Sequence, residues 1–535
     1  MTEFKKDEKE KLLKHVTNVD KDVYCVKNLP EEVVSVLFAY VSRSPLSFRE
    51  NLLKLLGSGD ILVGTGDVYQ DTGYEQAKKK AQKFHDKWVV GYGHSSVAEH
   101  ADIKFAVDKL SIVATKIIED NRLGRFTEKS TRYQKFDINN YHIPKKVRDS
   151  KYFEEFKKTA ELLFKTYDEL FPPMTEYIKK RMPKEEGVSE VAYENSVKAK
   201  VCDILRYLLP SGTITAMGFS LNARSAAHAI SKLLSYPLEE AKDLGKALLE
   251  EGNKICPTLL KYAQFNKYFH QTPLEIKPRA EQTLLEPPTN TEPVSLIHYD
   301  PDAEDRIVAS ILYEQSEQTY EQILEKVKQM NNDKKLDILE AYVKHKGQFD
   351  WPLRALENTY FITDILMDYG AFRDVQRHRI CTQINQIVTT RHGYDIPNDI
   401  IEAGLKDKFV NAMETAKKIH QKMESEMPME AQYVVPLAYR KRVLVTWNLR
   451  ELEHVIRLRT TEHGHESYRK IAQKLYEKVV EKFPSFKLLL TVDLNEYYLG
   501  RLKSEIKTQR KIEEIKKREV QEGKDLLKTL VEKKD

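Results

Sequence analysis

The residues best suited to chemistry lie between Arg373 and Arg391, in RDVQRHRICTQINQIVTTR, and centre on the triplet Arg377-His378-Arg379. Arg373 and Arg377 are four positions apart, so they share one face if the segment is helical. Two guanidinium groups beside an imidazole suit a planar, anionic ligand, because Arg presents a rigid donor fork and His can donate, accept or stack. A solvated basic helix end is the alternative, since the last turn of a helix favours cations.

An apolar series precedes the triplet, and its spacing is helical: Phe361, Ile365, Tyr369, Phe372 and Val375. This pattern predicts a buried helix that ends at the triplet. Such a helix would bring concentrated positive charge to one point.

A second polar group lies in the first half of the chain. A helical stretch is predicted from GHSSVAEHADIKFAV (93–107) to Asn121, and a polar loop follows it. Glu128, Ser130 and Arg132 would project alike from an extended loop and would offer an acceptor, a hydroxyl and a guanidinium to one ligand. A local capping loop explains the same residues without a ligand. No base stands beside Ser130 in the sequence to activate it as a nucleophile.

Composition excludes several classes of protein. The 535 residues carry a net charge of +5, which is too small to indicate nucleic-acid binding by itself. No apolar run approaches the roughly 18 residues of a membrane span, and the first residues, MTEFKKDEKEKLLKHV, lack the apolar core of a signal peptide. We therefore expect a cytoplasmic chain that does not contact a membrane.

The cysteines argue against a metal site. Cys25, Cys202, Cys256 and Cys381 show no CxxC or CxxH spacing, so neither zinc nor a disulfide framework is indicated. We expect no metal, and reduced cysteines that are mostly buried. Cys381 lies two residues after the triplet, and a nucleophilic role there is the alternative to packing as a small apolar residue.

The sequence also repeats itself. FSLNARSAAHAI (219–230) resembles VTWNLRELEHVI (445–456), and RYLLPSGT (206–213) resembles QYVVPLAY (432–439) at the same offset. Near the start of each half, VYCVKNLPEE (23–32) resembles VSLIHYDPDA (294–303). A tandem duplication is the simplest explanation.

Prolines mark the junction between the halves. Residues 278–293 contain four prolines and predict a linker, because such polar sequence resists helix and sheet. We expect homologous domains at 1–277 and 294–500, each with long helices and a small mixed or antiparallel sheet, hence the α+β class. Residues 501–535 form a charged tail that we expect to be an exposed helix, with a nucleic-acid-binding arm as the alternative.

Together these pieces resemble one family, the flavin-dependent thymidylate synthases, over most of both halves. Members carry a His-x-Ser-x-x-Glu-His element and a helix that ends in Arg-His-Arg-x-x-Ser-x-Asn-Glu-x-Ser-x-Arg-Tyr. An Asn-x-Arg helix followed by Leu-Arg comes later. The resemblance implies a fold like that of thymidylate synthase-complementing proteins, in two tandem copies.

Each half keeps a different part of this signature. The first half keeps Glu128-x-Ser130-x-Arg132-Tyr133 and the leading element, but it has Asp120-Asn121-Arg122 for Arg-His-Arg and Leu233 for the late arginine. The second half keeps Arg377-His378-Arg379 and the late Arg459, but it lacks the loop. It also departs from the family at several further positions: Pro352 and Arg354 in the leading region, Asp374 where members often have Gln, Ile387 in place of the loop serine, and Gln432 opposite Arg206.

The complementary losses suggest a composite site. In the family, as the resemblance implies, sites lie between the subunits of a homotetramer, with the basic helix end from one subunit and the loop from another. Duplication and fusion would make the two sites of an isologous pair distinguishable. We expect a chain that folds as a pseudo-dimer, a homodimer that reproduces the tetramer, and one live site that combines 377–379 with 128–132.

The resemblance further implies roles for single residues. Arg459 would polarise the uracil ring of dUMP, and Ser130 completes the expected catalytic pair. The other residues expected to bind dUMP are Arg377, Glu128, Arg132 and, at the phosphate, Arg206. Those expected to bind the flavin are His378, Arg379, Asn448, Arg450 and His454, with His94 and Ser96 on the flavin or folate side.

The implied reaction converts dUMP to dTMP, with methylenetetrahydrofolate and NADPH as co-substrates and FAD as cofactor. The alternative is a catalytically inactive homologue that binds flavin or nucleotide and acts as a binding or assembly protein. A third possibility, a nucleic-acid-associated protein, rests only on the basic tail and is disfavoured.

Overall fold

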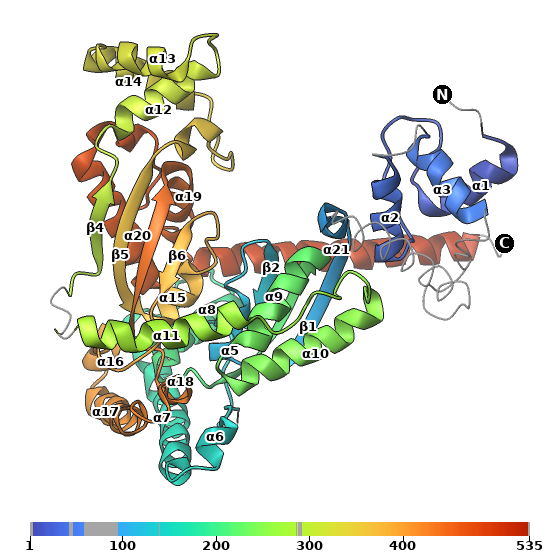
Figure 1. Ribbon diagram of the computed structural model, residues 1–535. Helices are drawn as coiled ribbons and strands as arrows, with labels where there is room; N and C mark the ends of the chain where they lie inside the picture. The colour runs from blue at the N-terminus through green and yellow to red at the C-terminus, as the bar shows by residue number, and fades with distance from the viewer. Residues whose placement is uncertain are drawn as a thin grey trace. The chain divides into compact units, whose positions relative to one another are not determined.

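The fold is α+β, with two small antiparallel sheets, as expected. The structure is a computed structural model that describes residues 4–41, 46–57, 95–138, 140–284, 286 and 291–532 (Figure 1). Its contacts divide the chain into two compact units: unit 1 comprises residues 1–129 and 214–286, and unit 2 comprises 130–213 and 287–535. Packing therefore assigns the 130–213 segment of the first half to the unit that contains the second half.

Unit 1 is built on a three-stranded sheet in the order β1-β3-β2, with β1 at Asp102–Ser111, β2 at Gly124–Glu128 and β3 at Ile214–Asn222. Phe105, Phe219 and Phe126 lie in register across the three strands, and their rings stack at 5.2 and 5.8 Å. Such cross-strand aromatic pairs stabilise a sheet. The helix predicted over 93–121 is wrong in part, because this stretch contains η2 (Ser95–His100), β1 and the short α5 (Ile112–Ile118).

Helices complete unit 1. The pair α9 (Ala223–Ser235) and α10 (Glu239–Ile255) packs against β1 and α5, and α11 follows at Lys267–Thr283. Since α11 ends at Thr283 and includes Pro273 and Pro278, the first part of the predicted 278–293 linker is helical. The first three helices enclose a small apolar core of their own: α1 (Lys6–His15), α2 (Glu31–Val41) and α3 (Phe48–Gly57).

Unit 2 is built on a four-stranded sheet in the order β4-β5-β7-β6. Its strands are β4 (Val294–Tyr299), β5 (Tyr360–Asp368), β6 (Thr382–Asn385) and β7 (Arg440–Asn448). The predicted helix through Phe361 and Ile365 is wrong, since both residues lie in β5 and only α15 (Tyr369–Val375) is helical. Inward side chains of a strand four apart satisfy a helical pattern as well as a period of two, which explains the error.

A local two-fold relation joins the two halves of the chain inside unit 2. Pro210 lies opposite Pro436, its counterpart in the repeat. The amide of Ser211 donates to the carbonyl of Val435 and that of Leu437 to Leu209, each at 2.9 Å. Gly212 donates to Tyr433 and Ala438 to Tyr207 in the same way. These four backbone bonds form two symmetry-related pairs, which is the signature of an isologous interface.

Long helices flank this relation. The first half contributes α6 (Lys145–Arg148), α7 (Phe153–Arg181), α8 (Glu190–Leu205) and η3 (Arg206–Leu208). The second half contributes α16 (Asn398–Glu402), α17 (Lys406–Met423), α18 (Pro428–Ala431), η5 (Gln432–Val434), α19 (Leu449–Arg459), α20 (Glu466–Lys482) and η6 (Pro484–Leu488). A further group of elements follows β4: α12 (Ala303–Tyr313), α13 (Tyr320–Lys328), α14 (Asn332–Val343) and η4 (Arg354–Glu357).

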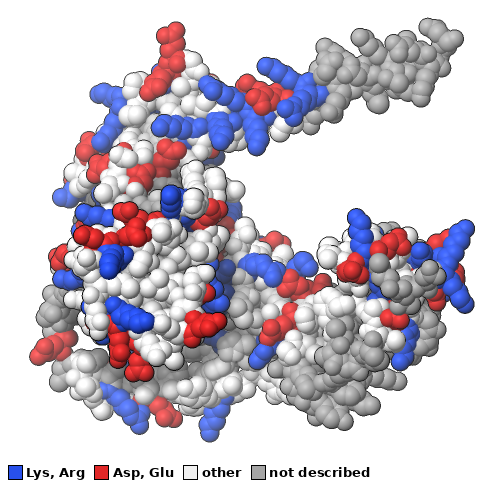
Figure 2. Space-filling view, turned by 90° about the horizontal axis from the view of Figure 1, so that it is seen from above, with Lys and Arg blue, Asp and Glu red and all other residues white. Residues whose placement is uncertain are grey.

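The tail forms α21, Leu502–Glu532, whose described side chains carry both signs of charge. Basic and acidic side chains are interspersed on the face shown in Figure 2. Cys202, Cys256 and Cys381 are buried, as expected, and Cys25 is exposed. Among the helices that the structure describes, none is both long and apolar enough to cross a membrane.

Candidate functional site

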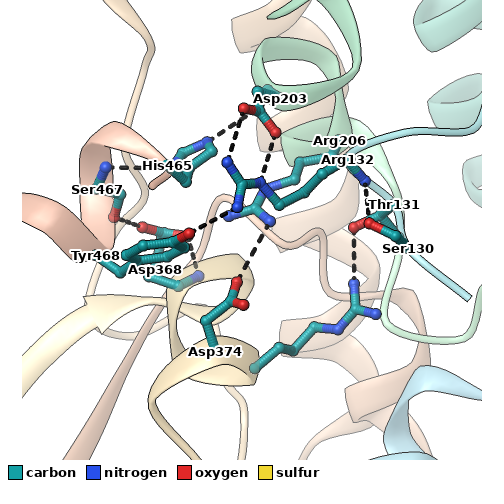
Figure 3. A network of polar contacts seen from close by, with 12 residues as sticks. Ser130, Thr131, Arg132, Asp203, Arg206, Asp368, Asp374, His465, Ser467 and Tyr468 are labelled. Carbon is teal, nitrogen blue, oxygen red and sulfur yellow. Dashed lines mark hydrogen bonds and ion pairs between the residues drawn. The ribbon is translucent and has the colours of Figure 1, made fainter. Parts of the chain in front are cut away.

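Unit 2 brings a loop of the first half beside a helix of the second. After β2 the chain turns, and the backbone amide of Arg132 donates to Ser130 Oγ at 3.2 Å. The neighbouring Thr131 Oγ1 accepts from Nη1 of Arg373, on α15, at 3.0 Å. The sequence-predicted loop and the basic helix therefore meet within one chain (Figure 3).

Arg132 is anchored by an aspartate that the sequence did not single out. Its Nε and Nη2 donate to both oxygens of Asp203, on α8, at 2.8 and 3.1 Å, and Nη1 donates to the hydroxyl of Tyr468 at 2.6 Å. Arg501 also binds Asp203, at 2.8 Å. Burial alone would raise the pKa of Asp203, but Arg132 and Arg501 outweigh it and lower that pKa, so the carboxylate is ionised.

Arg206 lies deep in the same network, with 1% of its surface exposed. Its Nη1 is 3.9 Å from Asp374, and its Nε and Nη2 have no hydrogen-bond partner among the described residues. Burial favours the neutral acid, but Arg132, Arg459 and Arg206 lower the pKa of Asp374 to about 2. A buried guanidinium with two unused donors is costly unless a ligand completes it.

Arg459 leads from this network to the basic triplet. Its Nε donates to Nε2 of His378 at 2.8 Å, and its Nη1 is 3.6 Å from Asp374. Burial, together with Arg459, lowers the pKa of His378 well below its usual value, so the ring is neutral. Because Nε2 accepts, the proton is assigned to Nδ1, which lies 3.4 Å from Oε1 of Glu451.

Two helix starts support the arginines. Asp368 caps α15 by accepting from the amide of Ala371 at 2.7 Å, and it also accepts from the Ser467 hydroxyl. Burial raises the pKa of Asp368 to about 6, against the opposing effect of Arg206. His465 caps α20 through Nδ1, while its Nε2–H donates to the carbonyl of Asp203 at 3.1 Å. The caps thus fix α15 and α20 relative to Asp203.

Of the residues expected to bind the flavin, His454 contacts His378, whereas Asn448 and Arg450 have other partners. Asn448 caps α19 by accepting from the amide of Glu451 at 2.8 Å, and Arg450 pairs with Glu357 at 2.6 Å. His454 stacks on Trp351 at 4.5 Å and meets His378 edge-on at 5.4 Å. Nδ1 of His454 is buried and has no hydrogen-bond partner among the described residues.

Other predicted residues are not brought into this network. Arg377 is exposed, and Arg379 is half-buried. Glu128 belongs to unit 1, where it pairs with Lys116 at 3.1 Å. The extended loop with three parallel side chains is therefore wrong, because the chain turns at Ser130. Ser96 is exposed in η2 of unit 1, and His94 lies outside the described residues.

A cavity of about 370 Å³ adjoins the network. It shares Asp203, Asp368, His465 and Arg501 with the network, but Arg132, Arg206 and Arg459 do not line it. The cavity is therefore distinct from the space around the arginines.

The chemical capacity of the site follows from its charges. Arg132, Arg459 and Arg206 all lower the pKa of one carboxylate, Asp374, and Arg377 adds a smaller effect from its exposed position. Among these four arginines, and within the part of the chain that the structure describes, only Arg132 has a second carboxylate, Asp203, within hydrogen-bond distance. Arg206 also faces Asp368. The guanidinium groups of Arg132, Arg206, Arg459 and Arg501 outnumber the carboxylates of Asp203, Asp374 and Asp368, and this surplus positive charge in a buried place suits an oxyanion.

A model of the thymidylate synthase complementing protein family matches the chain twice, over residues 58–258 and 295–485. The chain belongs to this family. The two matched regions correspond to the two repeats, so the tandem arrangement inferred from the sequence is confirmed.

Individual relatives span this family. A UPF0159 protein of Chlamydia muridarum is 36% identical over 525 residues, which are 94% of this chain and 98% of the relative. A UPF0159 protein of Thermoplasma acidophilum is 28% identical over 81% of this chain and 93% of its own length. A flavin-dependent thymidylate synthase of Clostridium tetani is 25% identical over 41% of this chain and 84% of its own length. One such enzyme thus corresponds to less than half of the chain.

Proposed function

We propose that the chain is a FAD-dependent thymidylate synthase that converts dUMP to dTMP with methylenetetrahydrofolate and NADPH. The observation that carries the proposal is the arginine network of unit 2, in which Thr131 of the first-repeat loop binds Arg373 of the second-repeat helix. The proposed live site combines these two segments of one chain. The symmetric bonds around Pro210 and Pro436 support a pseudo-dimer, and we propose that two chains associate into an assembly of four domains.

Nucleotide binding is assigned to the arginines. The unused Nε and Nη2 of Arg206 would donate to the phosphate of dUMP, while Asp203 and Tyr468 hold Arg132 in place. Ser130, at the turn, would accept from or donate to the nucleotide. Arg459 would meet a uracil carbonyl, and its permanent charge would stabilise negative charge that develops on the ring.

Residues near His378 fit a flavin. The buried Nδ1 of His454 lacks a partner among the described residues, and Trp351, which is 58% exposed, offers an aromatic face beside it. His378, Arg379 and Arg450 provide donors and positive charge of the kind that stabilises a reduced flavin ring. When bound, the flavin supplies the hydride that completes the new methyl group. Asn448 acts on this site by starting α19, which carries His454 and Arg459.

Tritium release from 5-tritiated dUMP tests the proposal, because the hydrogen at C5 must leave as a proton when the methyl group forms. Purified protein receives FAD, NADPH and methylenetetrahydrofolate, with each omitted in turn. We expect release only when all are present. Protein that stays yellow but releases no tritium would instead be the flavin-binding homologue without turnover.

Mixing two inactive variants tests the location of the site. Ser130→Ala and Arg459→Ala should each abolish release. Because the two segments meet within unit 2 of one chain, mixing the two proteins should not restore it. Restored activity would place the live site between chains and would contradict this part of the proposal.

A further inference from the structure

Asp374 lies among the arginines and has no hydrogen-bond partner among the side chains that the structure describes. It lies on α15, and 14% of its side chain is exposed. One carboxylate oxygen is 3.6 Å from Nη1 of Arg459, and the other is 3.9 Å from Nη1 of Arg206. Figure 3 shows Asp374 directed from its helix toward the guanidinium of Arg206.

These separations differ in kind from those of the neighbouring Asp203. Asp203 holds Arg132 and Arg501 with hydrogen bonds of 2.8 to 3.1 Å, which is a saturated arrangement. The contacts of Asp374 exceed hydrogen-bond length, so they supply charge but satisfy no donor. Arg206 accordingly keeps two nitrogens unused. The carboxylate of Asp374 therefore offsets positive charge in the network but leaves the hydrogen-bond donors of Arg206 unsatisfied.

A ligand oxyanion would enter at this point. The positive charges of Arg206 and Arg459 both act on Asp374, and those of Arg132 and Arg377 add to the positive potential there. An oxyanion on these donors would therefore lie beside a carboxylate. The pKa of Asp374, about 2, keeps that carboxylate charged at any physiological pH. Like charges at such a distance oppose each other strongly where water is excluded.

We propose that Asp374 sets the anion affinity and charge preference of this site. Its negative charge offsets part of the positive charge of Arg206 and Arg459 that would otherwise attract a ligand oxyanion. The inference rests on the proposed function only in naming a nucleotide phosphate as the oxyanion. Asp374 makes the network prefer a singly charged oxyanion over a doubly charged one. Without it, the arginines bind phosphate more tightly.

Calorimetric titration of the full chain with inorganic phosphate, and separately with dUMP, tests this. Asp374→Asn preserves shape and removes the charge. We expect Kd for both probes to fall about tenfold, since removing one adjacent like charge is worth one or more tenfold steps. The preference for singly charged phosphate, measured at pH 6 against pH 8, should also diminish relative to the wild type. Asp368, which faces Arg206 and has a pKa of about 6, titrates in this range in both proteins, so only the difference between variant and wild type reports on Asp374. An unchanged or higher Kd in Asp374→Asn would overturn the proposal.

A control and a second measurement separate this effect from misfolding. Asp300→Asn removes a carboxylate that pairs with Arg306 at 2.7 Å, outside the network, and should leave Kd unchanged. Phosphate should raise the Tm of Asp374→Asn by more than it raises that of the wild type. Equal increases in Tm would count against the proposal.

The titration needs neither flavin nor turnover. If the wild type releases no tritium but Asp374→Asn binds phosphate more tightly than the wild type, the synthase is rejected and this inference is retained. If the wild type releases tritium but Asp374→Asn binds phosphate as the wild type does, the synthase is supported and this inference is rejected.

Discussion

The two repeats share the contacts that start and anchor their helices, and they differ in the residues that could bind a ligand. Asn222 and Asn448 cap equivalent helices, each by accepting from an amide at 2.8 Å. Arg224 pairs with Glu99 as Arg450 pairs with Glu357. These contacts start a helix or tie it to a neighbouring turn. These contacts therefore belong to the scaffold of both copies, and any ligand role of Arg450 in the second copy is additional to its pairing with Glu357.

The differences fall where chemistry would take place. In the first repeat, Ile117 stands at the position of Asp374, and Leu233 at that of Arg459. Asn121, at the position of His378, donates to the carbonyl of Ile118 at 2.7 Å, which closes the end of its own helix. At these three positions one repeat has packing and capping residues, and the other has the residues that join its arginine network.

The reverse exchange also occurs. Arg206 and Asp203 of the first repeat correspond to Gln432 and Met429 of the second. Gln432 accepts from the amide of Val388 at 3.2 Å and donates to the carbonyl of Met429 at 3.1 Å. A side chain that satisfies backbone groups has replaced one with unused donors. Each repeat has therefore lost one part of a site, and unit 2 combines the parts that remain.

The largest expected effect concerns the late arginine, Arg459, which only the second repeat has. Arg459→Ala should lower kcat/KM for dUMP about 10³-fold, because it removes a preorganised charge from the reacting ring and unties His378. The matched change in the other repeat, Leu233→Ala, should leave kcat/KM within about threefold, since a core truncation acts through stability. Equal losses in the two variants would contradict a single live site.

A somewhat smaller effect should appear in stability. Asp203→Asn leaves the buried Arg132 and Arg501 without their carboxylate, and such a loss costs about 3–5 kcal/mol. Urea-induced unfolding measures it. Asp395→Asn breaks a pair that is about one-third exposed, which should cost less than about 1 kcal/mol. If the two variants lost equal stability, Asp203 would not anchor the network.

The caps of α5 and α15 give a pH-dependent comparison. Ser111 and Asp368 occupy the same position in the two repeats, and each accepts an amide of its helix. The folded-state pKa of Asp368 is raised from 3.8 to about 6, so folding favours its protonated form. Its contribution to stability is fully present below pH 3.8 and is lost as pH rises through 6, by up to about 3 kcal/mol.

The measurement is the free energy of unfolding between pH 5 and pH 8 for the wild type and Asp368→Asn. Asparagine retains an acceptor for Ala371 and does not titrate, so the decline toward pH 8 should become shallower. A matched Ser111→Asn change should leave the pH dependence as it is. An identical slope in Asp368→Asn and the wild type would assign the pH dependence to other groups.

The sequence allowed the tandem repeat and the α+β class to be predicted. These depend on residue identity and spacing, which a sequence displays directly. The expected combination of 377–379 with 128–132 stays a prediction, since the hydrogen bond between the two segments joins Thr131 to Arg373. The strand at β5 was missed because its inward residues Phe361 and Ile365 also fit a helical period. The turn at Ser130 was missed because alternating polar residues suit an extended loop equally well.

Partners in the network could not be predicted for a different reason. Tyr468 and Arg501 lie outside the quoted motifs and Asp203 lies just before RYLLPSGT, while Glu451 lies within VTWNLRELEHVI but has no feature in the sequence that singles it out. Only folding brings Asp203 to Arg132 and Glu451 to His378. The N-terminal preference of acidic side chains would have suggested a helix-capping role for Glu451, not a contact with an imidazole.

The smallest effect concerns the flavin and uses the one arginine that both repeats retain at the end of the basic segment. Arg379 and Arg122 are equivalent positions after α15 and α5. In the second repeat, Arg379 lies near Glu451 and His378, where burial raises the pKa of Glu451 to about 7 although Arg450 and Arg379 oppose the rise. We expect Arg379→Ala to weaken FAD binding about tenfold, as the loss of one charge-assisted contact would, and Arg122→Ala to leave it unchanged. Fluorescence quenching of FAD on titration with each variant measures both dissociation constants.

The contrary outcome concerns the first repeat. If Arg122→Ala weakened FAD binding as much as Arg379→Ala, the first repeat would hold a flavin too, and the assignment of all ligand chemistry to unit 2 would have to be abandoned.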